Sequence, residues 1–233
     1  MNIGLFGYGK MGKMIEQIAQ DRGHTIVAKI DADTTDIDYE SLDVAIDFST
    51  PDAAFGNITG CFKNGVPVIS GTTGWLEKYA EAVAICQQNQ GGFIYASNFS
   101  LGVNIFFELN AHLAKMMANL EQYKVSMEEI HHTQKLDAPS GTAITLAEGI
   151  IENSSYEKWE LDKSDAMTIP IKSVREGMVP GTHSIRYESS VDQIEIKHEA
   201  FNREGFALGA VIAAEWIQGK IGVFTMKDVL NLT

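Results

Sequence analysis

This sequence has little basic charge for its length. Its 233 residues include 18 Lys and Arg against 31 Asp and Glu, which gives a formal net charge of −13. A chain with this excess of negative charge is repelled by polyanions, so the composition argues against non-specific binding to nucleic acid or to an anionic membrane. An anionic ligand would therefore have to be attracted by a local positive patch.

Cysteine and long apolar runs are also scarce. Cys61 and Cys86 do not form a CxxC pair, and both fall in segments with a helical pattern. We therefore expect buried free thiols in a reducing cytoplasm rather than a disulfide. We expect no signal peptide and no membrane span, because an apolar stretch of about 18 residues is missing. With 45% hydrophobic residues, the chain can form one large domain or two small ones.

The first thirty residues have the pattern of a dinucleotide-binding unit. Asn2–Phe6 is short, apolar and β-prone, Gly7-Tyr8-Gly9-Lys10-Met11-Gly12 follows at once, and Lys13–Arg22 has helical spacing of apolar residues. A second strand is expected over His24–Ile30, with Asp31 at its end. The glycines of a GxGxxG turn let backbone amides approach a pyrophosphate, and the acidic residue accepts hydrogen bonds from the ribose. This context favours dinucleotide binding over an ordinary glycine-rich turn.

Further strands alternate with helices along the first half of the chain. Strands are expected at Asp43–Phe48, Val66–Ser70 and Gly92–Ala96, and helices at Ser49–Lys63 and Trp75–Gln88. This alternation predicts a parallel sheet, in which ligands bind beyond the carboxyl ends of the strands. Four turns at such ends outline a cofactor groove, although each alone could be an ordinary loop: Gly7–Gly12, Asp47–Ser49, Gly71–Gly74 and Asn98–Ser100.

The second half of the chain has grouped strands, which predict a smaller α+β domain with a mixed or antiparallel sheet. After a helix over Leu101–Leu120, the expected strands are Gln122–His131, Ile169–Val174, His183–Tyr187 and Gln193–His198, with a helix over Thr142–Asn153. The predicted fold class is therefore α/β. A Rossmann-like, dinucleotide-binding domain covers 1–100 and is completed by 204–233, and a substrate-binding and oligomerisation domain covers 101–203.

One segment, His131-His132-Thr133-Gln134-Lys135-Leu136-Asp137-Ala138-Pro139-Ser140-Gly141-Thr142, gathers cationic groups in this acidic chain. Ser140 or Thr142 can cap the helix that follows. A helix N-terminus offers N–H groups and partial positive charge, so the segment predicts a pocket for a small multiply charged anion. The alternative is a solvated loop that enters a capped helix.

A nucleotide fold followed by an anion-accepting turn indicates a dehydrogenase or reductase. The nicotinamide supplies the hydride, and the protein supplies orientation, anion binding and a proton donor. A histidine suits proton transfer near neutral pH. Because successive strand residues point to opposite sides, we expect His131 and His132 to have different roles. Either histidine could instead serve only as a hydrogen-bonded residue at a strand end.

Several motifs occur in a fixed order: Lys10-Met11-Gly12, Asp47-Phe48-Ser49, Gly71-Thr72-Thr73-Gly74, Asn98-Phe99-Ser100-Leu101-Gly102-Val103, Glu129-Ile130-His131-His132, Lys135, Asp137–Ala143, His198, Phe206-Ala207 and Met226–Leu230. In this order the chain resembles the 4-hydroxy-tetrahydrodipicolinate reductases, also called dihydrodipicolinate reductases, over nearly its whole length. The resemblance implies reduction of 4-hydroxy-tetrahydrodipicolinate, a dicarboxylate, to tetrahydrodipicolinate with NADH or NADPH in lysine and diaminopimelate biosynthesis. It also implies a homotetramer, in which each subunit has two domains joined by a hinge. We expect no metal.

The resemblance further implies roles for individual residues. His131 would be the proton donor and Lys135 its partner in catalysis. The substrate carboxylates would be held by His132, Lys135, Gly141 and Thr142. The residues expected at the cofactor are Gly7, Gly9, Lys10, Met11, Gly12 and Asp31, with Phe48, Gly71, Thr73, Asn98 and Phe99 towards its nicotinamide end.

Two departures from the family pattern concern the cofactor. Many members carry GxxGRMG, whereas Gly7–Gly12 is one residue shorter and has Lys10 for the arginine. Many NADPH users also have an arginine just after the ribose-binding acid, whereas here Asp31 is followed by Ala32 and Asp33. Two carboxylates would repel a 2′-phosphate, although Lys10 or Lys29 could offset this. We expect NADH to be used at least as well as NADPH.

Two other functions remain open at this stage. A different Rossmann reductase would keep Gly7–Gly12 but would not need His131, His132 and Lys135 together with Gly141 and Thr142. A nucleotide-sensing module would bind NADH without catalysis, and changing His131 would then alter nothing measurable.

Overall fold

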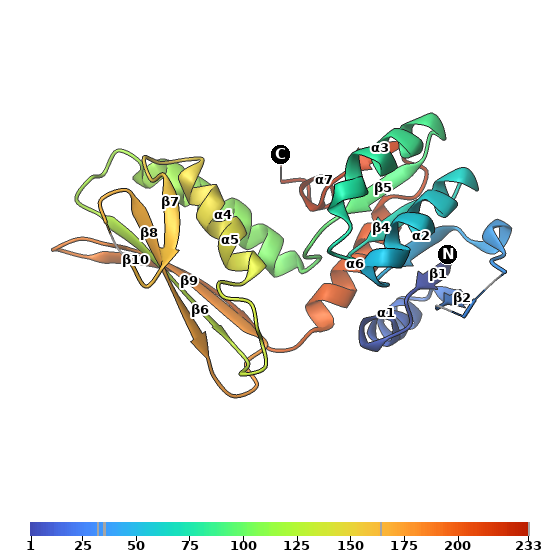
Figure 1. Cartoon of the computed structure of the whole chain (residues 1–233), viewed down its shortest axis with the longest axis horizontal. Helices are drawn as coiled ribbons and strands as arrows, with labels where there is room; N and C mark the ends of the chain where they lie inside the picture. The colour runs from blue at the N-terminus through green and yellow to red at the C-terminus, as the bar shows by residue number, and fades with distance from the viewer. Residues whose placement is uncertain (32, 35, 164, 233) are drawn as a thin grey trace. The chain divides into compact units, whose positions relative to one another are not determined.

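The computed structural model describes residues 1–31, 33–34, 36–163 and 165–232 and divides the chain into two compact units. Unit 1 consists of Met1–Leu101 and Glu204–Thr233, and unit 2 of Gly102–Arg203. Each unit has its own sheet and core (Figure 1). The fold is α/β, with a Rossmann-like sheet in unit 1 and a mixed sheet in unit 2, which confirms the predicted fold class.

The sheet of unit 1 has six strands in the order β11-β5-β4-β3-β1-β2, and every neighbouring pair is parallel. Their bounds are β1 (Asn2–Phe6), β2 (Thr25–Ile30), β3 (Val44–Asp47), β4 (Val68–Ser70), β5 (Gly92–Tyr95) and β11 (Gly222–Phe224). The central strands are buried on both faces, which explains their nearly continuous apolar sequence.

Helices cover both faces of this sheet. One core joins Leu5 and Ile46 to α1 (Lys10–Asp21) and α6 (Glu204–Trp216). The other joins Phe6 and Val68 to α2 (Pro51–Lys63) and α3 (Tyr79–Gln88). A short α7 (Met226–Leu230) contacts α6 and β11. Cys61 and Cys86 are buried and free in the second core, as predicted.

Three details of unit 1 differ from the sequence predictions. Helix α1 begins at Lys10 rather than Lys13, because extended Gly9 is its N-cap residue. The single helix expected over Trp75–Gln88 is a 3₁₀ turn, η2 (Leu76–Lys78), followed by α3; the buried Trp75 indole donates to the carbonyl of Thr72 at 2.8 Å. Strand β11 was not predicted, because a three-residue strand has no periodicity and forms only by pairing with β5.

The sheet of unit 2 has five strands in the order β10-β9-β6-β8-β7. Strand β6 pairs antiparallel with β9 and parallel with β8, so the sheet is mixed. The bounds are β6 (Lys124–His131), β7 (Lys158–Leu161), β8 (Thr168–Arg175), β9 (Gly181–Glu188) and β10 (Gln193–Ala200). Strand β7 was not predicted: its alternation spans only four residues, and its position depends on parallel pairing with β8.

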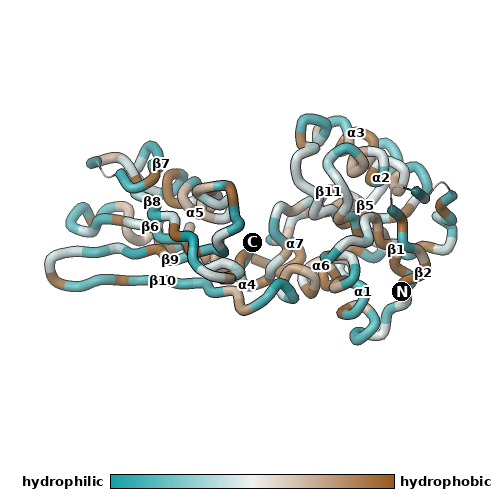
Figure 2. Tube along the Cα trace, turned by 60° about the horizontal axis from the view of Figure 1, so that its bottom comes forward, coloured by the Kyte–Doolittle hydropathy of each residue, from teal (hydrophilic) through white to brown (hydrophobic). Residues whose placement is uncertain are grey.

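Two helices cover one face of this sheet, α4 (Leu101–Met117) and α5 (Gly141–Ile151). Their apolar residues, such as Leu113 and Leu146, pack against Met127 and Ile185 of the strands. Edge strand β10 is exposed over much of its length, and Figure 2 shows the β9–β10 hairpin as largely hydrophilic. Within the described residues, none of the helices combines the length and apolar character needed to cross a membrane.

Candidate functional site

Unit 1 contains a groove of about 420 Å³ at the carboxyl ends of β1, β2 and β3. Four of the predicted cofactor residues line it: Gly7, Gly9, Asp31 and Phe48. Tyr8 and Thr34 also line it, and the Thr34 hydroxyl accepts a hydrogen bond from the backbone N–H of Asp31 at 3.1 Å. Lys10, Met11 and Gly12 form the first turn of α1, where helix N–H groups favour an anion. Ala32 lies outside the described residues.

The glycines fit the close approach of a dinucleotide. Gly7 has φ of +87°, and a Cβ there would lie 2.3 Å from the carbonyl oxygen of Phe48. A Cβ at Gly12 would lie 2.4 Å from the carbonyl oxygen of Gly7, so both positions exclude any larger residue. A Cβ at Gly9 would meet nothing within 4 Å, which leaves open space in front of the α1 N-terminus. This arrangement fits a pyrophosphate held by backbone amides.

The residues expected towards the nicotinamide lie at the next strand ends. The ring of Phe48 contacts that of Phe99 with a centroid distance of 5.8 Å. A Cβ at Gly71 would lie 2.3 Å from the Phe48 ring, so Phe48 brings these two turns together. The Asn98 side chain accepts a hydrogen bond from the Ser100 N–H at 2.9 Å, and Thr73 is exposed.

Asp47, which was predicted only as part of a turn and without a role of its own, connects the turns of this edge. Its buried carboxylate accepts hydrogen bonds from four side chains: Ser49 at 2.6 Å, Asn57 at 3.1 Å, Ser70 at 2.9 Å and Thr72 at 2.7 Å. Burial raises the pKa of Asp47, and the four hydrogen bonds oppose that rise only in part. Asp47 therefore fixes the ends of β3 and β4 and the start of α2 relative to one another.

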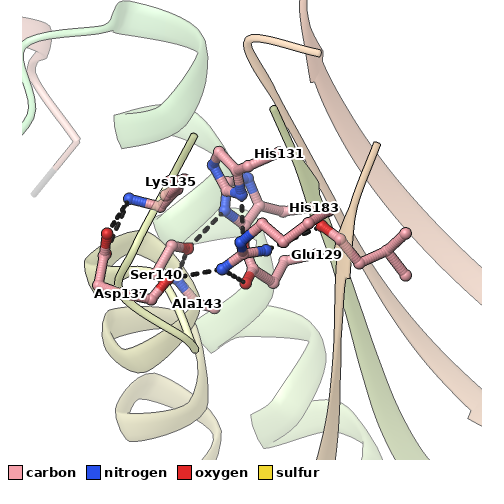
Figure 3. Close-up of polar contacts among 9 residues, drawn as sticks. Glu129, His131, Lys135, Asp137, Ser140, Ala143 and His183 are labelled. Carbon is pink, nitrogen blue, oxygen red and sulfur yellow. Dashed lines mark hydrogen bonds and ion pairs between the residues drawn. The ribbon is translucent and has the colours of Figure 1, made fainter. Parts of the chain in front are cut away.

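In unit 2, the two predicted histidines lie at the end of β6. His131 is the last residue of the strand and is buried, whereas His132 follows it and is half-buried. The imidazole Nδ1 of His131 contacts the carboxylate of Glu129, two residues earlier on the same face of β6. Glu129, which is labelled with His131 and His183 in Figure 3, is fully buried. It also accepts a hydrogen bond from Arg175 at 2.9 Å.

The charges around Glu129 keep it ionised. Burial acts to raise the pKa of Glu129, but hydrogen bonds from His131, Ser173 and Arg175 outweigh it and lower the pKa to about 2. An ionised carboxylate can only accept hydrogen bonds, so Nδ1 of His131 must carry a proton. The other ring nitrogen, Nε2, is then the atom through which His131 can exchange a proton with a ligand.

His183 on β9 lies beside this pair. Its ring meets that of His131 edge-on, with a centroid distance of 5.1 Å. Its Nε2 is 3.1 Å from the hydroxyl of Ser140. Burial, together with the positive charge of His131, lowers the pKa of His183 to about 3, so this imidazole stays neutral.

The anion-accepting turn that the sequence predicts is present at the start of α5. Ser140, rather than Thr142, is the N-cap, and its hydroxyl accepts a hydrogen bond from the N–H of Ala143 at 3.2 Å. Gly141 and Thr142 are the first helical residues, and Gly141 is exposed with open space around its Cα. The first turn of a helix carries N–H groups without intrahelical acceptors, which suits a carboxylate.

Lys135 lies in the loop between His132 and α5 (Figure 3). Its ammonium donates a hydrogen bond to Asp137 at 2.8 Å, and this contact lowers the pKa of the Asp137 carboxyl. The Asp137 side chain is 58% exposed, so a ligand carboxylate can compete with it for Lys135 from the solvent side. The segment therefore combines a histidine, an ammonium and a helix N-terminus.

Glu129, His131 and His183 offer ligand atoms within 4.8 Å of one another, which is a spacing that a metal ion could use. The guanidinium of Arg175, however, is 2.9 Å from the same carboxylate. A cation bound there would be repelled by this fixed positive charge and would have to displace its hydrogen bond. The donor set therefore fits a hydrogen-bonded acid better than a metal site.

Three residues of this cluster had no predicted role: Glu129, which the sequence shows only as part of the motif before His131, and Arg175 and His183. The sequence contains a signal for Glu129, because residues two apart on a strand share a face. An acidic residue two positions before His131 therefore indicates a partner for its imidazole. Arg175 and His183 reach the site only through the pairing of β8 and β9 with β6. No spacing in the sequence shows that pairing.

The lowered pKa of Glu129 predicts a specific acid sensitivity. Because its pKa of about 2 in the folded state is below the ordinary value of 4.5, the carboxylate stabilises the fold above pH 4.5, and this contribution is lost as the pH falls towards 2. In Glu129→Gln the free energy of unfolding should fall less steeply over this range, by up to about 1.4 kcal/mol per pH unit. Urea unfolding at several pH values measures both slopes; equal slopes would contradict the assignment.

Known proteins of one family are similar to this chain over nearly its whole length. Residues 1–99 match the family described as dihydrodipicolinate reductase, N-terminus, and residues 102–230 match dihydrodipicolinate reductase, C-terminus. The 4-hydroxy-tetrahydrodipicolinate reductase of Christiangramia forsetii is 61% identical over 99% of this chain and 98% of that protein. The enzyme of the same name from Thermosipho africanus is 36% identical over 99% of this chain and 98% of that protein.

A solved structure agrees as well. Dipicolinate-bound dihydrodipicolinate reductase from a Paenisporosarcina species superimposes with a TM-score of 0.78 at 25% identity, covering 97% of each chain. Together with the predicted motifs, these matches imply a nicotinamide cofactor and a small-molecule substrate. The chain therefore belongs to the dihydrodipicolinate reductase family of oxidoreductases, whose curated members are named 4-hydroxy-tetrahydrodipicolinate reductases.

Proposed function

We propose that this chain reduces (2S,4S)-4-hydroxy-2,3,4,5-tetrahydrodipicolinate to tetrahydrodipicolinate with NADH or NADPH, releasing water, in lysine and diaminopimelate biosynthesis. The observation that carries the proposal is the cluster in unit 2, where a buried histidine, an ammonium and a helix N-terminus lie in one short segment. That chemistry suits a small dicarboxylate that must be protonated as it is reduced. Cytoplasmic location stays a prediction from the sequence.

In this proposal unit 1 is the dinucleotide-binding domain, over 1–100 with 204–233. Gly7, Gly9 and the first turn of α1, with Lys10, Met11 and Gly12, hold the pyrophosphate, and Asp31 accepts from the ribose. The turns containing Phe48, Gly71, Thr73, Asn98 and Phe99 receive the nicotinamide end. The bound reduced nicotinamide supplies the hydride.

Unit 2, over 101–203, binds the substrate and supplies the proton. Gly141 and Thr142 at the α5 N-terminus hold one carboxylate, and His132 and Lys135 hold the other, with Lys135 leaving Asp137 to do so. His131 gives up a proton from Nε2. The proton on Nδ1 stays on the ring, hydrogen-bonded to the Glu129 carboxylate. The negative charge of the substrate favours the protonated imidazole. Substrate binding therefore promotes the form of His131 that donates the proton.

The two proposed catalytic residues, His131 and Lys135, can be tested by substitution. His131→Gln and Lys135→Ala should each lower kcat by roughly 100-fold or more, because the first removes the proton donor and the second removes its cationic partner. The assay follows oxidation of NADH by absorbance, with substrate made in situ from pyruvate and aspartate semialdehyde by the upstream synthase. His112→Gln and Lys115→Ala, exposed positions on α4, are the matched controls and should keep full activity.

Two results would contradict the proposal. Full activity in His131→Gln would remove the assigned donor. Absence of oxidation in the wild type with either cofactor, despite confirmed cofactor binding, would leave a nucleotide-sensing module or a Rossmann reductase with another substrate.

Contacts in unit 1 support NADH use at least as good as NADPH use. Lys29, which could offset repulsion of a 2′-phosphate, is already engaged: its ammonium is 2.8 Å from Glu16 and donates to the Tyr8 hydroxyl at 3.0 Å. The ammonium also lies 4.4 Å from the centroid of the Tyr8 ring. Tyr8 and Asp31 line the groove, and the Asp31 carboxylate adds negative charge to its lining.

The second prediction follows from this engagement of Lys29. In the wild type, kcat/KM for NADH should equal or exceed that for NADPH. Glu16→Gln should raise the NADPH/NADH ratio by up to about tenfold, because the charge of Lys29 is then uncompensated. The double variant Glu16→Gln, Lys29→Met should lose this gain. A wild-type ratio strongly in favour of NADPH would refute the preference.

The uncovered face of the unit 2 sheet supports assembly into a homotetramer. It is opposite to α4 and α5 and carries a shallow cavity of about 330 Å³, lined among others by Ser126, Glu128, Pro170 and Ser184. Its charges are paired within the face, as in Lys172–Glu128 at 2.7 Å. A face with small residues and internally compensated charge suits packing against a second copy of the same sheet.

The third prediction tests this assembly. Light scattering should give a mass four times the 25.6 kDa of one chain. Ser184→Glu places a second carboxylate near Glu128 on the face and should dissociate the assembly, whereas Lys115→Glu on α4 should not. A monomeric wild type would contradict the proposal.

A further inference from the structure

The buried carboxylate of Glu129 contacts two nitrogen-bearing side chains, Arg175 and His131, rather than one. Arg175 provides a fixed positive charge beside it, through the hydrogen bond of 2.9 Å. The contact with Nδ1 of His131 is additional to this ion pair. An ionised carboxylate at a ring nitrogen fixes which nitrogen holds the proton and how the ring is oriented, as carboxylates do for imidazoles elsewhere.

The fixed orientation of His131 points Nε2 at a position that lacks a side chain. A Cβ on Gly181 of β9 would lie 3.1 Å from Nε2. A larger residue at this position would therefore crowd the atom that exchanges the proton. Glycine here keeps access to that atom while the ring is held from behind by Glu129.

The other neighbouring imidazole cannot replace His131. His183 is fixed at 3.1 Å from the hydroxyl of Ser140, and its buried ring stays neutral. Across the sheet it is the register partner of Glu129, but the carboxylate contacts His131 instead. Of the two adjacent rings, His131 is the one whose ring nitrogen contacts the carboxylate.

Arg175 extends the same arrangement to the loop that carries Lys135. Its guanidinium donates to Glu129 and, at 2.6 Å, to the backbone carbonyl of Asp137. Arg175 is also the parallel register partner of His131 on β8. One side chain thus fixes both the carboxylate behind the proton donor and the loop between His132 and Ser140.

We propose that Glu129 and Arg175 are positioning residues for this reaction: Glu129 fixes the orientation and proton arrangement of His131, and Arg175 holds Glu129 and the Lys135 loop in place. The inference rests on the proposed function for its kinetic consequences. It assigns neither residue a contact with substrate or cofactor.

Glu129→Gln tests the first half, because it keeps the size of the side chain and removes its charge. We expect kcat to fall by about tenfold or more, with KM little changed, since the substrate-binding groups remain. The alkaline fall of the kcat–pH profile should move to lower pH, because the amide no longer favours the protonated imidazole. Glu129→Asp keeps the charge and should restore the wild-type position of that fall.

Glu215→Gln is the matched control. In unit 1, Glu215 also contacts an arginine and a histidine, with Arg22 and His24 each at 2.7 Å. Loss of this carboxylate should leave kcat and the pH profile unchanged. Arg175→Lys, which cannot reach both Glu129 and the Asp137 carbonyl, should raise KM as well as lower kcat.

Two outcomes overturn the inference: a wild-type pH profile in Glu129→Gln, or a lower kcat with no movement of the alkaline fall, which would show a purely structural role. Nitrogen NMR of the isotope-labelled full chain, with His131→Gln for assignment, gives a test that needs no Glu129 variant to fold. It should show Nδ1 of His131 protonated in the neutral ring; a proton on Nε2 alone would refute the role of Glu129. This measurement is independent of turnover, so it separates failure here from failure of the proposed function.

Discussion

The burial of one carboxylate determines how the site in unit 2 is arranged. Glu129 is fully enclosed, and a buried charge is tolerated only with partners that compensate and hydrogen-bond it. Those partners are Arg175 from β8 and His131 from the same strand. Because Arg175 also holds the carbonyl of Asp137, the requirement to neutralise Glu129 fixes the loop that leads to the α5 N-terminus.

Unit 1 uses a buried carboxylate in a different way. Asp47 is surrounded by hydroxyl and amide donors, whereas Glu129 has the cationic partner Arg175. Burial raises the pKa of Asp47, and the pKa of Glu129 is lowered. Asp47 organises backbone turns, and Glu129 organises an imidazole and a guanidinium. The difference suits the ligands that we propose for the two units: backbone amides for a dinucleotide, and side-chain charges for a dicarboxylate that is protonated.

The family assignment and the geometry answer different questions. The motifs around His131, Lys135 and Gly141 identify the reductase family, and the full-length relatives show it. They do not explain why His131 rather than His183 would supply the proton. That distinction depends on the contact between the Glu129 carboxylate and Nδ1 of His131, and on the burial that keeps His183 neutral.

The sequence by itself determined the alternating strands and helices of unit 1, the glycine turn after β1, the cap of α5 and the fold class, because these depend on local periodicity, backbone conformation and capping. It also placed the helix ends to within a few residues, missing Gly9 as the cap of α1. Only the tertiary structure decided the pairing of β7 and β11 and the meeting of Glu129, Arg175 and His183. Those contacts include residues 54 positions apart, Glu129 and His183, and residues 130 positions apart, Gly92 and Gly222. Their register comes from sheet pairing and burial, which no local pattern encodes.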